Sequence, residues 1–244
     1  MKITFLGTSH GYPEIGRYCA GILVEHSGHG FIIDAGAPLD YLFRNRGIRP
    51  ESVKAYFITH MHADHTASLT SIAKTYTVYY KDGDADIFFP EETAIQPFRA
   101  WVAAQHLNMN PAKLRLRAVK PGVIYSDYGI QVTAIRTEHI APDIPSYAYM
   151  IESDNGKRVL FTGDLAYDFH DFPAVAYEKP FDLIVSELTH FSADKAQPIL
   201  DRADTKQMIF SHVTPSNTAL LESQHIRFHF PHLVAVDGFE FFVS

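Results

Sequence analysis

The hexapeptide HMHADH at positions 60–65 constrains the fold more than any other feature of the chain. It places four side chains that commonly bind metal ions within six residues. The apolar run 55–59 before it is typical of a buried strand, and residues 66–74 after it carry apolar side chains at helical spacing. We expect the strand to place His60 and His62 on one face, because residues two apart in a strand share a face. The turn into the helix then brings the aspartate and the last histidine to the same edge. The alternative, four polar residues on a surface turn, is disfavoured because imidazole and carboxylate together suit zinc, iron and manganese.

The pattern H-x-H-x-D-H is the motif of the metallo-β-lactamase superfamily, and this sequence resembles members of that superfamily over most of its length. The resemblance implies an α/β fold, a four-layer αβ/βα sandwich with the metal site at one edge. The residues point the same way, because many short apolar runs with helical segments between them suggest two sheets covered by helices. At 244 residues, without a linker or repeat, the chain is expected to form one domain spanning residues 1–244.

The periodicity predicts the individual elements. Helices are expected over 38–46, 91–107 and 193–203, in addition to the one after the hexapeptide. Further strands are expected over 3–6, 21–25, 31–34, 78–80, 86–89, 119–124, 130–136, 148–152, 158–162, 181–186, 207–211 and 233–236. Glycine-containing turns at 27–30 and 153–156 are typical of hairpins.

Three further polar residues come just after predicted strands: His139, Asp164 and His212. Each of them alone could be an ordinary turn residue, but the hexapeptide makes a shared metal site the better interpretation. The resemblance implies two metal ions and divides the ligands between them. One metal would be held by His60, His62 and His139, the other by Asp64, His65 and His212, with Asp164 and a water or hydroxide bridging them.

The imidazole and carboxylate ligands favour Zn²⁺. Mn²⁺ or iron are the alternatives, because the candidates include no cysteine, whose thiolate would select zinc. Cys19 is the only cysteine, so the chain can form no internal disulfide, which fits a reducing compartment. The sequence has no apolar run long enough for a signal peptide or a transmembrane helix. We therefore expect a cytoplasmic protein without a membrane association.

Three segments resemble the phosphodiesterase branch of the superfamily, typified by ribonuclease Z and the cyclic phosphodiesterases. The N-terminal succession 5–13, 17–21 and 31–36 is similar to the opening of that branch, and 212–217 resembles its closing motif. In 186–190 a glutamate and a histidine match a catalytic pair of ribonuclease Z, although they lie closer together than in that enzyme.

The resemblance gives this pair a role. His190 would donate a proton to the leaving oxygen or stabilise charge on the phosphate, and Glu187 would orient His190. Asp64, besides binding metal, would hold the attacking hydroxide in orientation. The simpler interpretation of Glu187 and His190 is a surface carboxylate and a histidine that caps a helix.

Two departures from ribonuclease Z argue against a tRNA substrate. The segment 164–187 leaves no room for the arm that grips tRNA in that enzyme, and the loop 13–17 has no lysine. The net charge of −7 also argues against tight nonspecific binding of nucleic acid, which usually requires a basic surface.

The sequence therefore predicts a metal-dependent hydrolase that cleaves a small or cyclic phosphodiester by attack of a metal-bridging hydroxide. The alternatives are a carboxyl-ester or lactone hydrolase of the same fold, a tRNA 3′-processing endonuclease, and a non-catalytic metal-binding protein. A homodimer is a weaker expectation, carried only by the resemblance.

Overall fold

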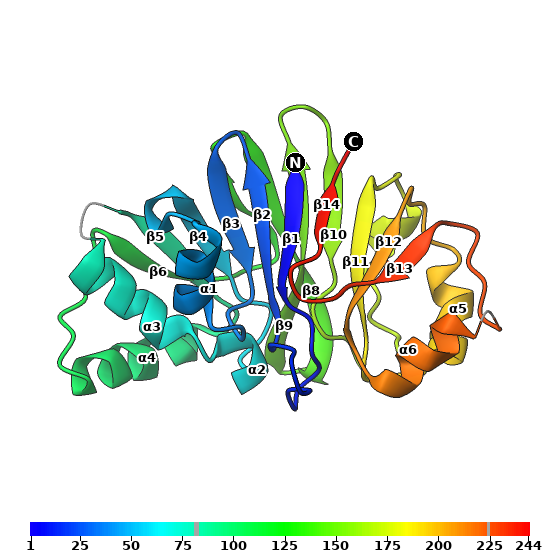
Figure 1. The fold of residues 1–244 in the computed structure, drawn as a ribbon, viewed down its shortest axis with the longest axis horizontal. Coiled ribbons are helices and arrows are strands. Elements are labelled where there is room, and N and C mark those ends of the chain that lie inside the picture. Colours follow the sequence, from blue (N-terminus) through cyan, green and yellow to red (C-terminus); the bar gives the residue numbers. More distant parts are fainter. Residues whose placement is uncertain (81–82, 224) are drawn as a thin grey trace.

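Two sheets face each other at the centre of the molecule, as the computed structural model shows for residues 1–80, 83–223 and 225–244 (Figure 1). In the described residues each sheet has seven strands. The first sheet runs in the order β14 (Glu240–Phe242), β1 (Lys2–Gly7), β2 (Gly21–His26), β3 (His29–Ile33), β4 (Val53–Phe57), β5 (Ala85–Phe89) and β6 (Leu114–Ala118). The second runs in the order β13 (His232–Val234), β12 (Met208–Val213), β11 (Leu183–Leu188), β10 (Arg158–Phe161), β9 (Ile144–Ser153), β8 (Ile130–Ala141) and β7 (Gly122–Asp127).

Helices cover the outer face of each sheet. The first sheet carries α1 (Leu39–Arg46), α2 (Ala63–Thr66), α3 (Leu69–Lys74) and α4 (Glu92–Ala104), and the second carries α5 (Ala193–Leu200) and α6 (Pro215–Glu222) (Figure 1). One apolar core fills the space between the sheets, where the rings of Phe57 and Tyr149 lie 5.6 Å apart. Two further apolar clusters lie between each sheet and its helices. The predicted four-layer αβ/βα sandwich is therefore confirmed.

The turn chemistry explains two hairpins. In the first, His26 pairs with His29, and the two residues between them, Ser27 and Gly28, both have positive φ values. A two-residue turn with both φ values positive matches the twist of the paired strands. In the second, β9 and β10 pair in antiparallel fashion across the turn that contains Gly156, whose φ is also positive. Both predicted hairpins are confirmed.

Some predicted boundaries are wrong. β4 ends at Phe57, so His60 and His62 lie in the connection to α2 and not on a strand. Residues 78–80 are not a strand, because α3 continues into a helical turn over Thr75–Tyr79. β-branched and aromatic residues gave that segment strand character. In the fold, Tyr76 instead inserts into the core, where its hydroxyl donates to the carbonyl of Pro50 at 2.7 Å.

The connections that follow several strands meet at one edge of the sandwich. β4 is parallel to β3 and β5, and β10, β11 and β12 are parallel to one another, so their carboxyl ends point the same way within each sheet. Across the two sheets, the hydroxyl of Tyr149 donates to the carbonyl of Ile58 at 2.6 Å. The backbone N–H of Tyr147 donates to the carbonyl of Thr59 at 2.9 Å. This edge therefore joins the two halves. No helix in the described parts of the chain is both long and apolar enough to span a lipid bilayer.

Candidate metal centre

All seven predicted metal ligands converge at this edge. His60 and His62 come from the connection between β4 and α2, and Asp64 and His65 come from α2 itself. The other three come from the second half of the molecule: His139 in β8, Asp164 after β10 and His212 in β12. Among the described residues, two groups with ligand atoms within 4.8 Å of one another correspond to the two predicted triads: His60, His62 and His139, and Asp64, His65 and His212. The same criterion also joins Asp164 to His60 and His65, and to His139 and His190.

Asp164 is the centre of the cluster. Its Oδ2 atom lies 3.3 Å from Nε2 of His212, 3.5 Å from His65, 3.7 Å from His60, and 3.8 Å from both His139 and His190. The carboxylate is buried, and burial would raise its pKa, but the charges of His212 and His65 outweigh this and hold the pKa of Asp164 well below its ordinary value. Asp164 is therefore an anion surrounded by imidazole rings.

The partners of the Nδ1 atoms assign the tautomers of two ligands. Nδ1 of His65 donates to Oδ2 of Asp34 at 2.7 Å. Nδ1 of His60 lies 3.0 Å from the hydroxyl of Thr59, which itself donates to Asp34 at 2.9 Å, so His60 is the donor to Thr59. Because each Nδ1 donates to a partner outside the cluster, Nε2 is the atom of both rings that faces the centre and can bind a metal ion.

Backbone carbonyls assign the tautomers of two more ligands. Nδ1 of His139 donates to the carbonyl of Leu165 at 3.1 Å, and Nδ1 of His212 donates to the carbonyl of Ser9 at 2.9 Å. His62 differs, because its Nδ1 faces the centre and lies 3.0 Å from Nε2 of His60. Four imidazoles therefore offer Nε2 to the centre and one offers Nδ1.

This arrangement fits a bound cation. Nε2 of His65 is one of three buried side-chain polar atoms in the described residues that have no hydrogen-bond partner. Burial lowers the pKa of His60 well below its ordinary value, which keeps that imidazole neutral, as metal binding requires. Burial lowers the pKa of His65 and of His212, but the Asp164 carboxylate outweighs this and raises both pKa values. The centre therefore favours positive charge, which a divalent cation would supply. Nitrogen and carboxylate donors suit Zn²⁺, Mn²⁺ and iron alike.

Glu187 and His190 lie together beside the cluster. Nδ1 of His190 donates to the Glu187 carboxylate at 2.8 and 2.9 Å, and the carboxylate also accepts from the backbone N–H of Leu165 at 2.6 Å. Burial lowers the pKa of His190, but the hydrogen bonds and charge of Glu187 outweigh this and raise the pKa above its ordinary value. The structure therefore places next to Asp164 an imidazole whose protonated form is stabilised.

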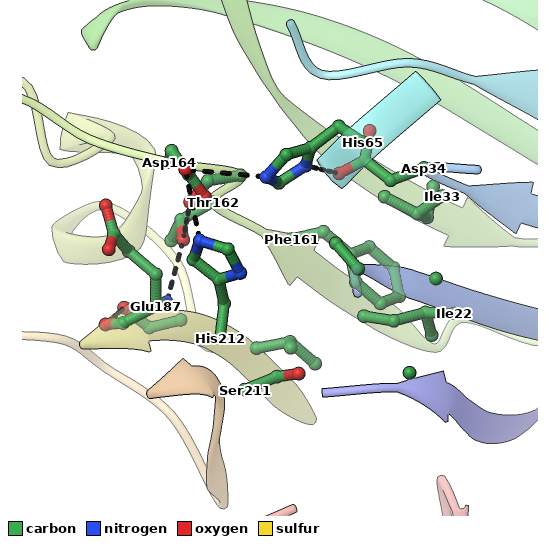
Figure 2. A pocket seen from close by; sticks show the side chains of 16 residues that line it. Ile22, Ile33, Asp34, His65, Phe161, Thr162, Asp164, Glu187, Ser211 and His212 are labelled. Carbon is green, nitrogen blue, oxygen red and sulfur yellow. Dashed lines mark hydrogen bonds and ion pairs between the residues drawn. The ribbon is translucent and has the colours of Figure 1, made fainter. Parts of the chain in front are cut away.

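Asp34 is a site residue to which the sequence assigned no role. It is 4% exposed, and its carboxylate accepts hydrogen bonds from His65 and from both the backbone N–H and the hydroxyl of Thr59. Figure 2 shows His65 between Asp34 on one side and Asp164 on the other. Asp34 comes directly after β3, so the reasoning that singled out Asp164 after its strand could also have found it.

Two hollows adjoin the cluster. The residues in Figure 2 line a cavity of about 40 Å³, which is too small for an organic substrate. A surface groove of about 460 Å³ begins at His190, and its wall includes Tyr167, Lys195, Thr214 and Ser216. His190 is thus the boundary between the cluster and a groove that is open to solvent.

Comparisons with known proteins agree with this geometry. Residues 1–197 match the family model described as Anti-Pycsar protein Apyc1. Ribonuclease Z of Methanocaldococcus jannaschii is 28% identical over 160 residues, which are 65% of this chain and 50% of that protein. The chain spans about half the length of the curated relatives that it matches first.

Solved structures resemble the whole chain. The metallo-β-lactamase fold protein YhfI from Bacillus subtilis has a TM-score of 0.77 at 20% identity, with 98% of both chains covered. Human tRNase Z, short form, has a TM-score of 0.76 at 17% identity, with 100% of both chains covered. At these identities the likeness concerns the fold, and it confirms the predicted metallo-β-lactamase fold.

Proposed function

This chain belongs to the family described as Anti-Pycsar protein Apyc1, within the ribonuclease Z and phosphodiesterase branch of the metallo-β-lactamase superfamily, and we propose that it is a dinuclear metal-dependent phosphodiesterase. Its substrate in this proposal is a small or cyclic phosphodiester. The observation that carries the proposal is the convergence of two ligand triads on the carboxylate of Asp164, with the His190–Glu187 pair beside it.

The metal ligands are assigned by the two triads. His60, His62 and His139 would hold one ion, Asp64, His65 and His212 would hold the other, and Asp164 would be a ligand shared by both. Zn²⁺ is the ion we favour, with Mn²⁺ or iron as the alternatives. Two such ions lower the pKa of a water molecule and neutralise the charge that develops on phosphate oxygens during an in-line displacement.

The protein's own groups supply orientation and proton transfer. Asp64, which is partly exposed, accepts a hydrogen bond from the attacking water and keeps its lone pair directed at phosphorus. As the bond from phosphorus to the leaving oxygen breaks, His190 passes the proton on its Nε2 to that oxygen. Glu187 holds the ring through Nδ1 and stabilises its protonated form. The alcohol then departs on the side of the groove that begins at His190.

A small substrate is favoured over tRNA for two reasons. Between Asp164 and the start of β11 at Leu183, the chain forms only a short 3₁₀ helix, Ala174–Tyr177, and connecting loops, so no arm extends from it. The net charge of −7 gives the molecule no global attraction for a polyanion. A tRNA 3′-processing endonuclease remains the second candidate, because the curated relatives carry the name Ribonuclease Z.

The test is hydrolysis of bis(p-nitrophenyl) phosphate by metal-analysed protein supplemented in turn with Zn²⁺ and Mn²⁺. We expect activity that requires about two metal ions per chain and that falls at least about 100-fold in Asp164→Ala. Asp168→Ala is the matched control, because that aspartate is exposed and pairs only with the exposed His170 in the described residues. Hydrolysis of a lactone or thioester but of no phosphodiester would favour the carboxyl-ester alternative. Two bound metals with no hydrolysis of any ester would favour a binding role.

Two further expectations belong to this proposal. We infer a cytoplasmic protein, for which the single free cysteine, Cys19, is suitable. We also infer a homodimer, and sedimentation velocity at several protein concentrations distinguishes it from a monomer.

A further inference from the structure

His190 lies in a turn whose backbone has few partners of its own. Residues 189–192, between β11 and α5, have no regular secondary structure. Backbone groups in such a segment still need hydrogen bonds when they are buried. Within the turn, the Glu187 carboxylate accepts from the backbone N–H of Thr189 and of His190 at 3.0 and 3.2 Å. The side chain of Asn217 in α6 binds three further backbone groups, one in the turn and one on each side of it.

The Asn217 amide spans the turn on both sides of His190. Its Nδ2 donates to the carbonyl of Leu188 at 2.8 Å and to the carbonyl of Phe191 at 2.9 Å, and its Oδ1 accepts from the backbone N–H of Ala193 at 3.0 Å. The residue is 4% exposed. Both amide hydrogens are used, so the side chain has one defined orientation, and no other residue type offers two donors and an acceptor at this reach.

Asn217 is itself tied to a metal ligand. It lies in the first turn of α6, where the hydroxyl of Thr214 accepts from its backbone N–H, and α6 follows directly on the strand that carries His212. A second link runs the same way, because the hydroxyl of Thr189 donates to the carbonyl of His212 at 2.6 Å. The position of the His190 turn is therefore set relative to the metal cluster.

We propose that Asn217 is a positioning residue for the reaction: it fixes the turn so that Nε2 of His190 meets the leaving oxygen. This inference rests on the proposed phosphodiesterase function. Glu187 sets the rotation and charge of the His190 ring and also accepts from the backbone N–H of His190, whereas Asn217 fixes the backbone at both ends of the turn that carries it. A displacement of about 1 Å at a catalytic group can cost about 100-fold in rate.

The dependence of the rate on the leaving group separates this role from a merely structural one. A p-nitrophenolate ion is stable enough to leave without a proton, whereas a phenolate without the nitro group needs the proton more. Loss of the acid, or loss of its position, should therefore slow diphenyl phosphate far more than bis(p-nitrophenyl) phosphate. For Asn217→Ala and His190→Ala we expect kcat for diphenyl phosphate to fall at least about tenfold more than kcat for bis(p-nitrophenyl) phosphate.

Three variants sharpen the test. Asn217→Asp keeps the shape but turns a carboxylate oxygen toward the carbonyls of Leu188 and Phe191, so we expect an effect at least as large as that of Asn217→Ala. Asn217→Ser leaves one hydroxyl as a hydrogen-bonding group. It should change the ratio of the two kcat values in the same direction as Asn217→Ala but by a smaller factor. This variant provides the test if the alanine variant does not fold. Thr218→Ala is the matched control, because in the described residues its hydroxyl bonds only to the carbonyl of Thr214, the N-cap of the same helix.

The double variant His190→Ala/Asn217→Ala decides the question. If Asn217 acts through His190, the double variant has the kcat values of His190→Ala alone, because the two changes remove one function. Losses that multiply, or that are equal for both diesters, or that follow a loss of bound metal, would overturn the proposal and leave Asn217 a structural residue. Hydrolysis of neither diester by the metal-loaded wild-type protein would instead contradict the proposed function, and this inference would fall with it.

Discussion

Asp34 links the two proposed metal triads through a single buried carboxylate. It binds His65 of one triad directly and reaches His60 of the other through the hydroxyl of Thr59. Its φ of 61° is in the left-handed region, which is unfavourable for a residue with a side chain. His212 has a similar φ of 58°. Strained residues of this kind persist where the surroundings fix them, and here the hydrogen bonds of the cluster provide that constraint.

The metal centre also depends on Gly36, because the backbone of Asp64 lies very close to this glycine. A Cβ atom at this position would lie 1.6 Å from the carbonyl oxygen of Asp64, so Gly36→Ala must push the first turn of α2 away. We expect the variant to lose about 1–3 kcal/mol of unfolding free energy and to bind metal at least about tenfold more weakly. Urea denaturation and a competition titration with a chelator measure the two effects.

A neighbouring glycine provides the control for this prediction. The Cβ atom of Gly11→Ala would approach the carboxylate of Asp64 to 3.6 Å, which is an ordinary contact. That variant should keep the stability and the metal affinity of the wild type. Wild-type metal binding by Gly36→Ala would contradict the proposed dependence on this contact.

At the scale of the elements, the sequence predicted what depends on local pattern. The hairpin turns and the apolar strands depend on neighbouring residues, and the structure contains them. Of the three ligands predicted just after strands, Asp164 does follow β10, whereas His139 and His212 lie within β8 and β12. The strand predicted for residues 78–80 is wrong. The helical turn forms there because Tyr76 is buried in the core, and local residue propensities carry no information about that burial. The partners of His139 and His212 are backbone carbonyls from segments distant in sequence. Residue type does not reveal such partners, so that part of the site required the structure.

The junction of β10, β11 and β12 depends on Asp182. Its carboxylate accepts from the backbone N–H of Arg158 at 2.9 Å and from Nζ of Lys206 at 2.7 Å. Burial raises the pKa of Asp182, but these partners outweigh burial and hold the pKa below its ordinary value. The carboxylate therefore stabilises the fold above its unfolded-state pKa of about 4, and this contribution is lost as the pH falls through the lower folded-state pKa.

Asp182→Asn should accordingly destabilise the protein at pH 7 by about 1 kcal/mol, since Lys206 is well exposed and its charge is screened. The deficit should stay constant from about pH 7 to 5 and shrink below about pH 4. Urea denaturation of metal-free protein across this range measures it. Asp143→Asn removes the same charge from an exposed loop and should change little. A deficit that grows toward acid pH would contradict the assignment.

At the scale of the molecule, the metal centre joins the two halves of the sandwich. The segment after β4, which includes α2, supplies four of the candidate ligands, and the strands of the second sheet and the loop after β10 supply the other three. The apolar core between the sheets is continuous and includes side chains from both, such as Phe57 and Tyr149. We therefore propose that residues 1–244 form one cooperative domain, and that bound metal adds to its stability by holding the sheets together.

Calorimetry with and without metal tests this proposal. Binding at about 1,000 times the dissociation constant stabilises a folded protein by about 4 kcal/mol, which for a chain of this size raises the Tm by roughly 10 °C. We expect one transition in both states, with chelator lowering the Tm by about that amount. Asp164→Ala should lose most of this rise in Tm, because the variant lacks the carboxylate that contacts ligands of both triads. Two separate transitions would contradict the single domain. An unchanged Tm after metal removal, confirmed by elemental analysis, would contradict the role of the centre in joining the sheets.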